Sequence, residues 1–358
     1  MTRNLLGLAL LALVAIVGCG RSPYDNPIGT NSQQPDKQLF DQAIHYLENN
    51  RYDVARLTLQ TMMNTYPDSE YLAKAKLAVA DSWYRQGTRY AMAQAEAEYD
   101  DFITFFPSME ESAEAQKRIC EIHYDQMVKP DRDNTHAVRA DQECRQLLMQ
   151  WPNSIFRDET EQKLREVQEL IAESEFRVGM FYTEKGSYRA GSNRLQTVTE
   201  HYPLFSNADV ALWSLGETYE NMGEQFTEPM VAAYSKIVSQ YPHSSYVDDA
   251  KAKLAELNRP IPDADPERFE LHKYNLGLQD RKGFWARSFG IFGSAPDMRM
   301  AAKAGTPAAT TLMPSTPPGI RGSTATVGTT PTADVSVETI DGPSALDTEP
   351  DARQGNQN

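Results

Sequence analysis

The sequence predicts an all-α protein: a superhelical array of about five tetratricopeptide-like helical hairpins, with a disordered N-terminal tether and a disordered C-terminal tail. Two observations predict this fold. Small residues recur ahead of four of five aromatic-proline pairs, and an apolar residue follows each small residue four positions later, which places both on one face of a helix. The pairs, each an aromatic residue followed by proline, recur as well, and such recurrence at intervals of 20 to 50 residues is typical of repeat proteins. They occur at Tyr66-Pro67, Phe106-Pro107, Trp151-Pro152, Tyr202-Pro203 and Tyr241-Pro242.

Residues 1–18 read as an export signal. Arg3 precedes an uncharged apolar run from Leu5 to Gly18. As a helix this run rises only about 21 Å, which is short for a transmembrane span and favours cleavage. The residues Ile16-Val17-Gly18-Cys19 resemble a bacterial lipobox, in which the cysteine receives a diacylglyceryl group and becomes the mature N-terminus. The alternative is an ordinary signal peptide in which Cys19 is coincidental.

Residues 19–35 then form a lipidated, flexible tether, because they carry Ser, Pro, Asn, Gly and Gln without apolar periodicity. Several acyl chains on Cys19 would hold the protein stably at a membrane. Gly20, rather than an aspartate, follows Cys19. In the lipoproteins that this segment resembles, such a residue permits sorting to the outer membrane, so the resemblance implies that location here.

The repeat domain is expected at residues 36–257. Proline ends the second helix of each hairpin, because its ring cannot continue a helix. Neighbouring hairpins must stack to complete a core, although the same periodicity also fits an irregular helical bundle. The small and apolar positions that identify the second helices are Ala55 with Leu59, Ala95 with Tyr99, Ala140 with Cys144, and Gly191 with Leu195.

The aromatic-proline pairs lie further apart than the roughly 34 residues of a standard repeat. Two insertions account for most of this difference. Residues Met127 to Thr135 are polar around Lys129-Pro130 and predict a loop inside the third hairpin. Apolar residues at helical spacing between Ser154 and Ser174 predict one long helix that continues into the fourth hairpin.

The repeat pattern ends after Leu257. Residues 258–303 form an extension whose structure the pattern leaves ambiguous. Residues 304–358 are dominated by Thr, Pro, Ala, Ser, Gly and Asp, with almost no aromatic residues to bury. We therefore expect a disordered low-complexity tail, because such a chain cannot offset its ordering entropy.

The charge favours protein partners. The formal net charge of −15 argues against nucleic acid as a partner. No catalytic motif, phosphate-binding glycine loop or metal motif is present, so we expect no enzyme, no cofactor and no metal site. The six histidines are scattered through the predicted elements: His45, His123, His136, His201, His243 and His272.

Two cysteines remain beside Cys19. Cys120 occupies the small-residue position of one predicted helix and Cys144 the apolar position of its partner. They therefore face each other in the third hairpin, either as a disulfide, which an oxidising periplasm permits, or as two buried free thiols.

Residues 30 to 257 resemble the BamD family of outer-membrane assembly lipoproteins, also called ComL or YfiO. Asp131-Arg132-Asp133-Asn134-Thr135-His136-Ala137 is similar to the family's Asp-Arg-Asp-x-x-His-Ala segment. The fourth hairpin, from Phe176 to Gly186 and then Asn193-Arg194-Leu195, looks like the family's helices at that point. The lipobox ahead of five repeats is the third point of resemblance.

The resemblance implies a scaffold subunit of the complex that inserts β-barrel proteins into the outer membrane, facing the periplasm. It implies that Arg194 contacts a POTRA domain of BamA, with other assembly subunits and unfolded outer-membrane precursors as further partners. An arginine on a helix exterior is otherwise most often only solvated. The alternative function is another periplasmic tetratricopeptide adaptor, for cell division or peptidoglycan machinery.

Overall fold

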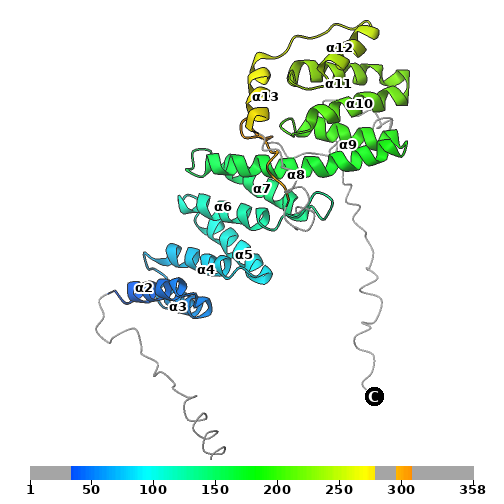
Figure 1. Cartoon of the computed structure of the whole chain (residues 1–358). Coiled ribbons are helices and arrows are strands. Elements are labelled where there is room, and N and C mark those ends of the chain that lie inside the picture. The colour runs from blue at the N-terminus through cyan, green and yellow to red at the C-terminus, as the bar shows by residue number, and fades with distance from the viewer. Residues whose placement is uncertain (1–33, 279–295, 309–358) are drawn as a thin grey trace, which may run out of the picture. The chain divides into compact units, whose positions relative to one another are not determined.

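Five antiparallel helical hairpins follow one another along the chain (Figure 1). The structure is a computed structural model that describes residues 34–278 and 296–308, and no strand occurs within these two ranges. The helices are α2 (Pro35–Glu48), α3 (Tyr52–Thr65), α4 (Leu72–Gln86), α5 (Arg89–Phe105), α6 (Glu111–Tyr124), α7 (Thr135–Gln150), α8 (Arg157–Glu184), α9 (Tyr188–His201), α10 (Ala208–Met222), α11 (Thr227–Gln240), α12 (Val247–Glu256) and α13 (Pro266–Leu278), with a short 3₁₀ turn, η1 (Glu224–Phe226).

The aromatic-proline pairs end the second helix of each hairpin in the same way. The aromatic residue is the first one past the helix, with φ between −124° and −129° and ψ between 50° and 68° in all five cases. Its N–H still donates to the carbonyl four residues earlier, as from Tyr66 to Met62 at 2.8 Å. The following proline has no N–H to continue this ladder. The repeat predicted from these pairs is confirmed.

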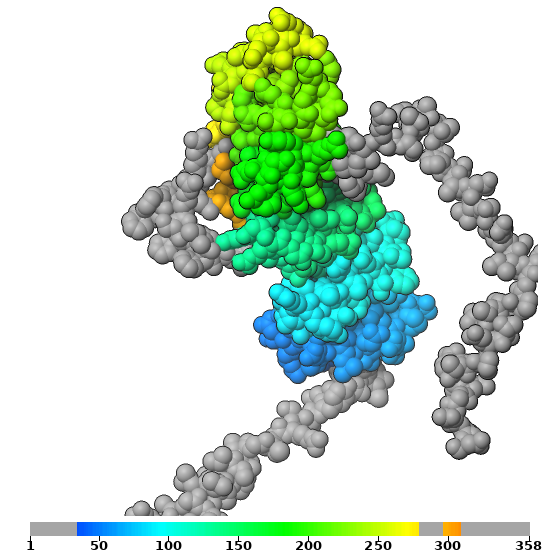
Figure 2. All heavy atoms as spheres, turned by 90° about the vertical axis from the view of Figure 1, so that its right-hand side faces the viewer, coloured from blue at the N-terminus to red at the C-terminus, as the bar shows by residue number. Residues whose placement is uncertain are grey.

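Small residues let the paired helices pack closely, as the spacing predicts. Ala55, Leu59, Ala95 and Ala140 are completely buried. The second helix of each hairpin also contacts the first helix of the next one, so every hairpin is covered by its neighbours. Figure 2 shows the repeats in chain order, from blue through cyan to green and yellow. The stacked array is therefore confirmed in place of an irregular bundle.

The two insertions fall where the sequence predicts them. The third hairpin has a long loop between α6 and α7. Helix α8 runs without interruption through 28 residues. Its first half packs against α6 and α7, and its second half pairs with α9. This single helix fixes the fourth hairpin relative to the third.

The C-terminal extension contributes helix α13 and an irregular segment, residues 296–308, that packs against α8. Residues 304–308 are thus part of the packed structure, whereas the sequence places the start of the low-complexity tail at residue 304. Backbone hydrogen bonds from helix side chains, rather than burial of large side chains, hold this stretch. Across the described part of the chain, no helix combines the length and the apolar character that a membrane span needs.

Candidate partner-binding surface

Two glycines bring the helices of the fourth hairpin into close contact. A Cβ atom on Gly191 would lie 2.3 Å from Thr183 Oγ1 and 3.1 Å from the carbonyl oxygen of Gly179. A Cβ atom on Gly179 would lie 3.0 Å from Leu195 and 3.3 Å from the Cβ of Arg194. Any larger residue would push α8 and α9 apart, so these glycines determine where Arg194 lies along α8.

Arg194 lies on α9 and forms an ion pair with Glu175 on α8, with 2.7 Å between Nη1 and Oε2. The Arg194 side chain is 46% exposed and that of Glu175 is 25% exposed. A pair of this exposure stabilises the fold by less than about 1 kcal/mol. The pair uses one of the five N–H donors of the guanidinium. Arg194 can therefore leave Glu175 for a carboxylate of another protein, or bind both carboxylates together, at little cost in free energy.

An exposed apolar strip lies on the same helix as Glu175. Glu175, Val178 and Tyr182 follow the i, i+3, i+7 spacing of one helix face. Val178, Phe181 and Tyr182 are 38%, 54% and 37% exposed. Aromatic side chains beside an arginine are the composition that protein interfaces favour. The fourth hairpin thus presents a charged group together with apolar area.

The segment Asp131 to Ala137 leads into α7 and joins the third hairpin to α8. Asp133 Oδ1 accepts hydrogen bonds from the N–H and the hydroxyl of Thr135, at 2.9 and 2.6 Å. These bonds lower the pKa of Asp133. The amide of Asn134 donates to Ser174 Oγ on α8 at 2.7 Å. The loop between α6 and α7 is therefore attached to the long helix.

His136, at the end of this segment, belongs to a polar cluster that the sequence did not predict. Nδ1 of His136 lies 3.1 Å from Nδ1 of His123, and Nε2 of His123 lies 3.2 Å from Glu96 on α5. Arg139 lies 3.0 Å from the same carboxylate. His123 and Arg139 lower the pKa of Glu96 to about 2, despite its partial burial. Only the spatial alignment of α5, α6 and α7 reveals this cluster, because its members are far apart in sequence.

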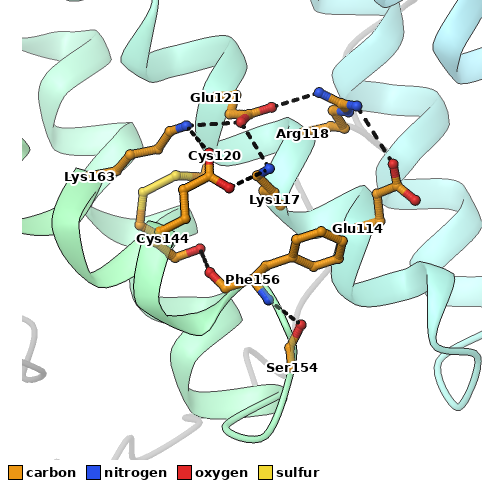
Figure 3. Close-up of polar contacts among 11 residues, drawn as sticks. Glu114, Lys117, Arg118, Cys120, Glu121, Cys144, Ser154, Phe156 and Lys163 are labelled. Atoms are coloured by element: carbon orange, nitrogen blue, oxygen red, sulfur yellow. Dashed lines mark hydrogen bonds and ion pairs between the residues drawn. A yellow bond between two sulfur atoms is a disulfide. The ribbon is translucent and has the colours of Figure 1, made fainter.

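Cys120 and Cys144 lie opposite each other in the third hairpin, as their positions predict. Their sulfur atoms are bonded in the structure, and their Cα atoms are 5.1 Å apart (Figure 3). This separation is within the range of ordinary disulfides. Both residues are completely buried, beside Leu164 of α8.

Next to this bond, three basic side chains surround the buried carboxylate of Glu121, as Figure 3 shows. Lys163 Nζ lies 3.0 Å, Arg118 3.0 Å and Lys117 3.5 Å from its oxygens. Burial raises the pKa of Glu121, but the three cations lower it by more, so the pKa of this carboxyl lies below its ordinary value. Lys163 belongs to α8, so the network joins the third hairpin to the long helix.

The remaining predicted site residue, Cys19, lies outside the described residues. The partner of Arg194 was missed in the sequence. Glu175 and Arg194 lie on either side of the turn between α8 and α9. Aligning the two helices antiparallel about that turn would have identified Glu175 as the partner. Among residues 34–278 and 296–308, no group of three or more His, Cys, Asp or Glu side chains could hold a metal ion.

Comparisons with known proteins agree with this architecture. The profile of the family described as "YfiO: Outer membrane lipoprotein" matches residues 32–230, which extends from the start of the first hairpin into the fifth. A similar protein from Caulobacter vibrioides, named outer membrane protein assembly factor BamD, is 24% identical over 60% of this chain and 69% of its own length.

Proteins with the same name from Xylella fastidiosa and Vibrio cholerae are each 22% identical. The first match covers 62% of this chain and 77% of the relative, and the second covers 60% and 90%. The family profile spans more than half of the chain, and it covers most of the stacked hairpins and the whole Arg194 surface. The chain belongs to the YfiO (BamD) family of outer membrane lipoproteins.

Proposed function

We propose that this protein is a lipid-anchored scaffold subunit of the machinery that assembles β-barrel proteins in the outer membrane. The observation that carries the proposal is the fourth hairpin, where Arg194 and its half-exposed apolar neighbours lie within the region that matches the family. The relatives' name, outer membrane protein assembly factor, supports the same role.

Arg194 is the proposed contact with a periplasmic POTRA domain of BamA. Its bond to Glu175 leaves the guanidinium about half exposed at the surface. A carboxylate or carbonyl of the partner can accept from the N–H donors that this bond leaves. Val178, Phe181 and Tyr182 add apolar area beside the charge. A few such residues supply most of the binding energy of a typical interface.

The first two hairpins are the proposed receiving surface for unfolded barrel precursors. Tyr46, Tyr52, Trp83 and Tyr84 are each partly buried there, so part of every ring remains accessible. The guanidinium of Arg56 stacks over Trp83 at 3.5 Å and covers one of these rings. We assign no individual residue to the precursors, because all four rings also pack in the core clusters of these hairpins.

Lipidation of Cys19 is the proposed anchor. Acyl chains on this residue, followed by a polar tether, would leave the stacked hairpins in the periplasm at the inner face of the outer membrane. A chain that carries Cys19→Ser is expected to lose palmitate labelling and to leave the membrane fraction.

The proposed function is tested by isolating the lipidated protein from its native envelope in mild detergent and identifying what co-purifies. We expect BamA, with at least a tenfold lower yield for Arg194→Glu, because the reversed charge meets the same partner surface. The double variant Arg194→Glu/Glu175→Arg restores the internal pair but not the outward charge, and should stay defective. This double variant separates loss of contact from loss of folding.

Arg259→Glu is the matched control, because Arg259 also pairs with one exposed glutamate, Glu228, and lies just past the end of α12. It should leave BamA recovery unchanged. Recovery of division or peptidoglycan proteins without BamA would instead favour the adaptor function. Equal recovery of BamA with wild-type and Arg194→Glu protein would remove Arg194 from the interface.

A further inference from the structure

The segment formed by residues 296–308 lies across α8 beside α13. It is orange in Figure 1, where it crosses the green α8, and in Figure 2 it lies against the green repeats. Within it the chain forms no helix or strand. Residues 279–295 separate it from α13 in the sequence. It is therefore a peptide segment laid onto helices formed by another part of the chain.

Side chains of the helices pair with the backbone of this segment. Gln168 of α8 donates to the carbonyl of Ala308 at 2.9 Å and accepts from the N–H of Ala308 at 3.1 Å. Asn275 of α13 accepts from the N–H groups of Lys303 and Ala304, at 2.9 and 3.0 Å. It also donates to the carbonyl of Ala304 at 3.2 Å. Each amide side chain thus satisfies both backbone polar groups of one residue, Ala308 or Ala304.

A third helix side chain extends the same pattern. Arg165 of α8 donates to the carbonyl of Gly305 at 2.9 Å. Gln168 and Asn275 are 5% and 9% exposed. Buried amides need partners, and here these partners are backbone groups that every residue carries. The contact therefore recognises backbone groups rather than particular side chains.

The space beneath residues 301–308 is occupied by small side chains. Ala301 and Ala302 are 1% and 5% exposed, and Pro307 is buried. Gly305 has φ +102°, and a Cβ atom on it would lie 2.8 Å from Leu204 and 3.3 Å from Leu271. Lys303 Nζ lies 3.7 Å from Glu166 of α8, so one basic side chain meets an acid at the edge.

We propose that α8, α13 and the residues around Leu204 form a binding groove for a polypeptide segment, which residues 301–308 occupy in this chain. The external occupant is a segment of another protein that is similar to residues 301–308, rich in alanine with glycine, proline and one basic residue, and it displaces the internal segment. The argument for this occupant is the internal segment itself, whose backbone bonds, small side chains and single lysine define what the groove accepts.

The groove uses other residues than Arg194 and Glu175. The outcome of a test of the groove is therefore independent of the proposed contact with BamA. Its own segment lowers the apparent affinity for any competitor, because only the fraction of molecules with an open groove can bind. A change that releases the segment without touching the groove must then increase binding.

Gly305→Val is that change. Valine cannot adopt φ +102° without strain, and its Cβ meets Leu204. The full chain, purified in detergent, is titrated with a fluorescent synthetic peptide of residues 298–308, and binding is followed by anisotropy. We expect Gly305→Val to lower the dissociation constant for the peptide at least tenfold relative to wild type. Adding Gln168→Met and Asn275→Leu, which keep side-chain size but remove the amides, should reverse this gain.

A second peptide, N-methylated at the residues that match Ala304 and Ala308, tests backbone recognition. It keeps every side chain but lacks two N–H donors, so we expect at least tenfold weaker binding to Gly305→Val. Ala304→Pro in the full chain is a second releasing variant, since it removes the N–H that Asn275 accepts. Circular dichroism verifies that both variants retain their helices.

Three results would overturn the proposal. One is equal peptide affinity of wild type and both releasing variants. Another is unchanged binding of the N-methylated peptide. The third is dimerisation of the releasing variants without peptide uptake, since this would mean that the groove exchanges segments between two copies of this chain.

Discussion

The third and fourth hairpins are neighbours along α8 but are held together by different physical means. In the third, a bond between Cys120 and Cys144 lies beside the charge network of Glu121. In the fourth, Gly179 and Gly191 leave room for Leu195 and Thr183 of the facing helix to pack directly against the glycine backbone. The third hairpin therefore depends on chemical state, oxidised and ionised, whereas the fourth depends on side-chain volume.

Two buried glutamates sharpen this difference. Glu121 and Glu169 are 8% and 7% exposed. Glu121 has three cations around it and a lowered pKa. Glu169, on α8, accepts from the backbone N–H of Ser206 at 2.9 Å and from the Ser206 hydroxyl. Burial raises the pKa of Glu169 to about 7, because these neutral donors only partly compensate for the lost water. Burial alone thus does not decide the charge of a carboxylate.

The largest expected effect is loss of the bond in the third hairpin. The cysteines are 24 residues apart in sequence, and closing a loop of this length stabilises a fold by about 3 kcal/mol. We expect reductant to lower the free energy of unfolding of the chain carrying Cys19→Ser by that amount, measured by urea denaturation. The fourth hairpin offers no comparable redox sensitivity.

The matched control is the variant Cys120→Ala/Cys144→Ala, whose stability should not respond to reductant. Mass spectrometry after alkylation without reductant should find neither cysteine modified. Two alkylated thiols under these conditions would show that the protein carries free cysteines in the third hairpin.

The next largest effect concerns Glu169 and pH. The pKa of this group rises from an unfolded value of 4.5 to about 7 on folding, so the folded state binds more protons between these values. Stability therefore falls as pH rises through this window, by about 2 to 3 kcal/mol between pH 5 and pH 8. Glu169→Gln should lack this component, which thermal or urea unfolding at both pH values measures. An identical pH dependence in the two proteins would show that Glu169 is not buried as a neutral acid.

The smallest of the three effects tests close packing in the fourth hairpin. Gly191→Ala places a methyl group against Thr183 and the backbone of α8, and overpacking of this kind costs about 2 kcal/mol. Gly277→Ala is the matched control, because this helical glycine has open space around it, and alanine there should stabilise α13 by up to about 1 kcal/mol. Urea denaturation of both variants gives the comparison. Equal effects of the two substitutions would mean that the helices of the fourth hairpin are not in tight contact.

Much of the fold follows from local patterns. The five aromatic-proline pairs determine where second helices end, because a missing N–H and a restricted ring act within one turn of chain. A small residue four positions before an apolar one, as at Gly191 and Leu195, marks a close helix contact, because the two positions lie on the same face of the helix. These signals were enough to predict the hairpins, the loop before α7 and the long helix α8.

The sequence by itself also placed Cys120 opposite Cys144, since helix periodicity puts residues on faces. Arg194 was singled out by the resemblance to the family and not by periodicity. Only the tertiary structure paired Arg194 with Glu175, joined Glu96 to His123 and Arg139, and laid residues 304–308 on α8. Such contacts join residues far apart in the chain. They depend on how hairpins stack, and a low-complexity segment whose backbone is bound by Gln168 and Asn275 carries no pattern that reveals it.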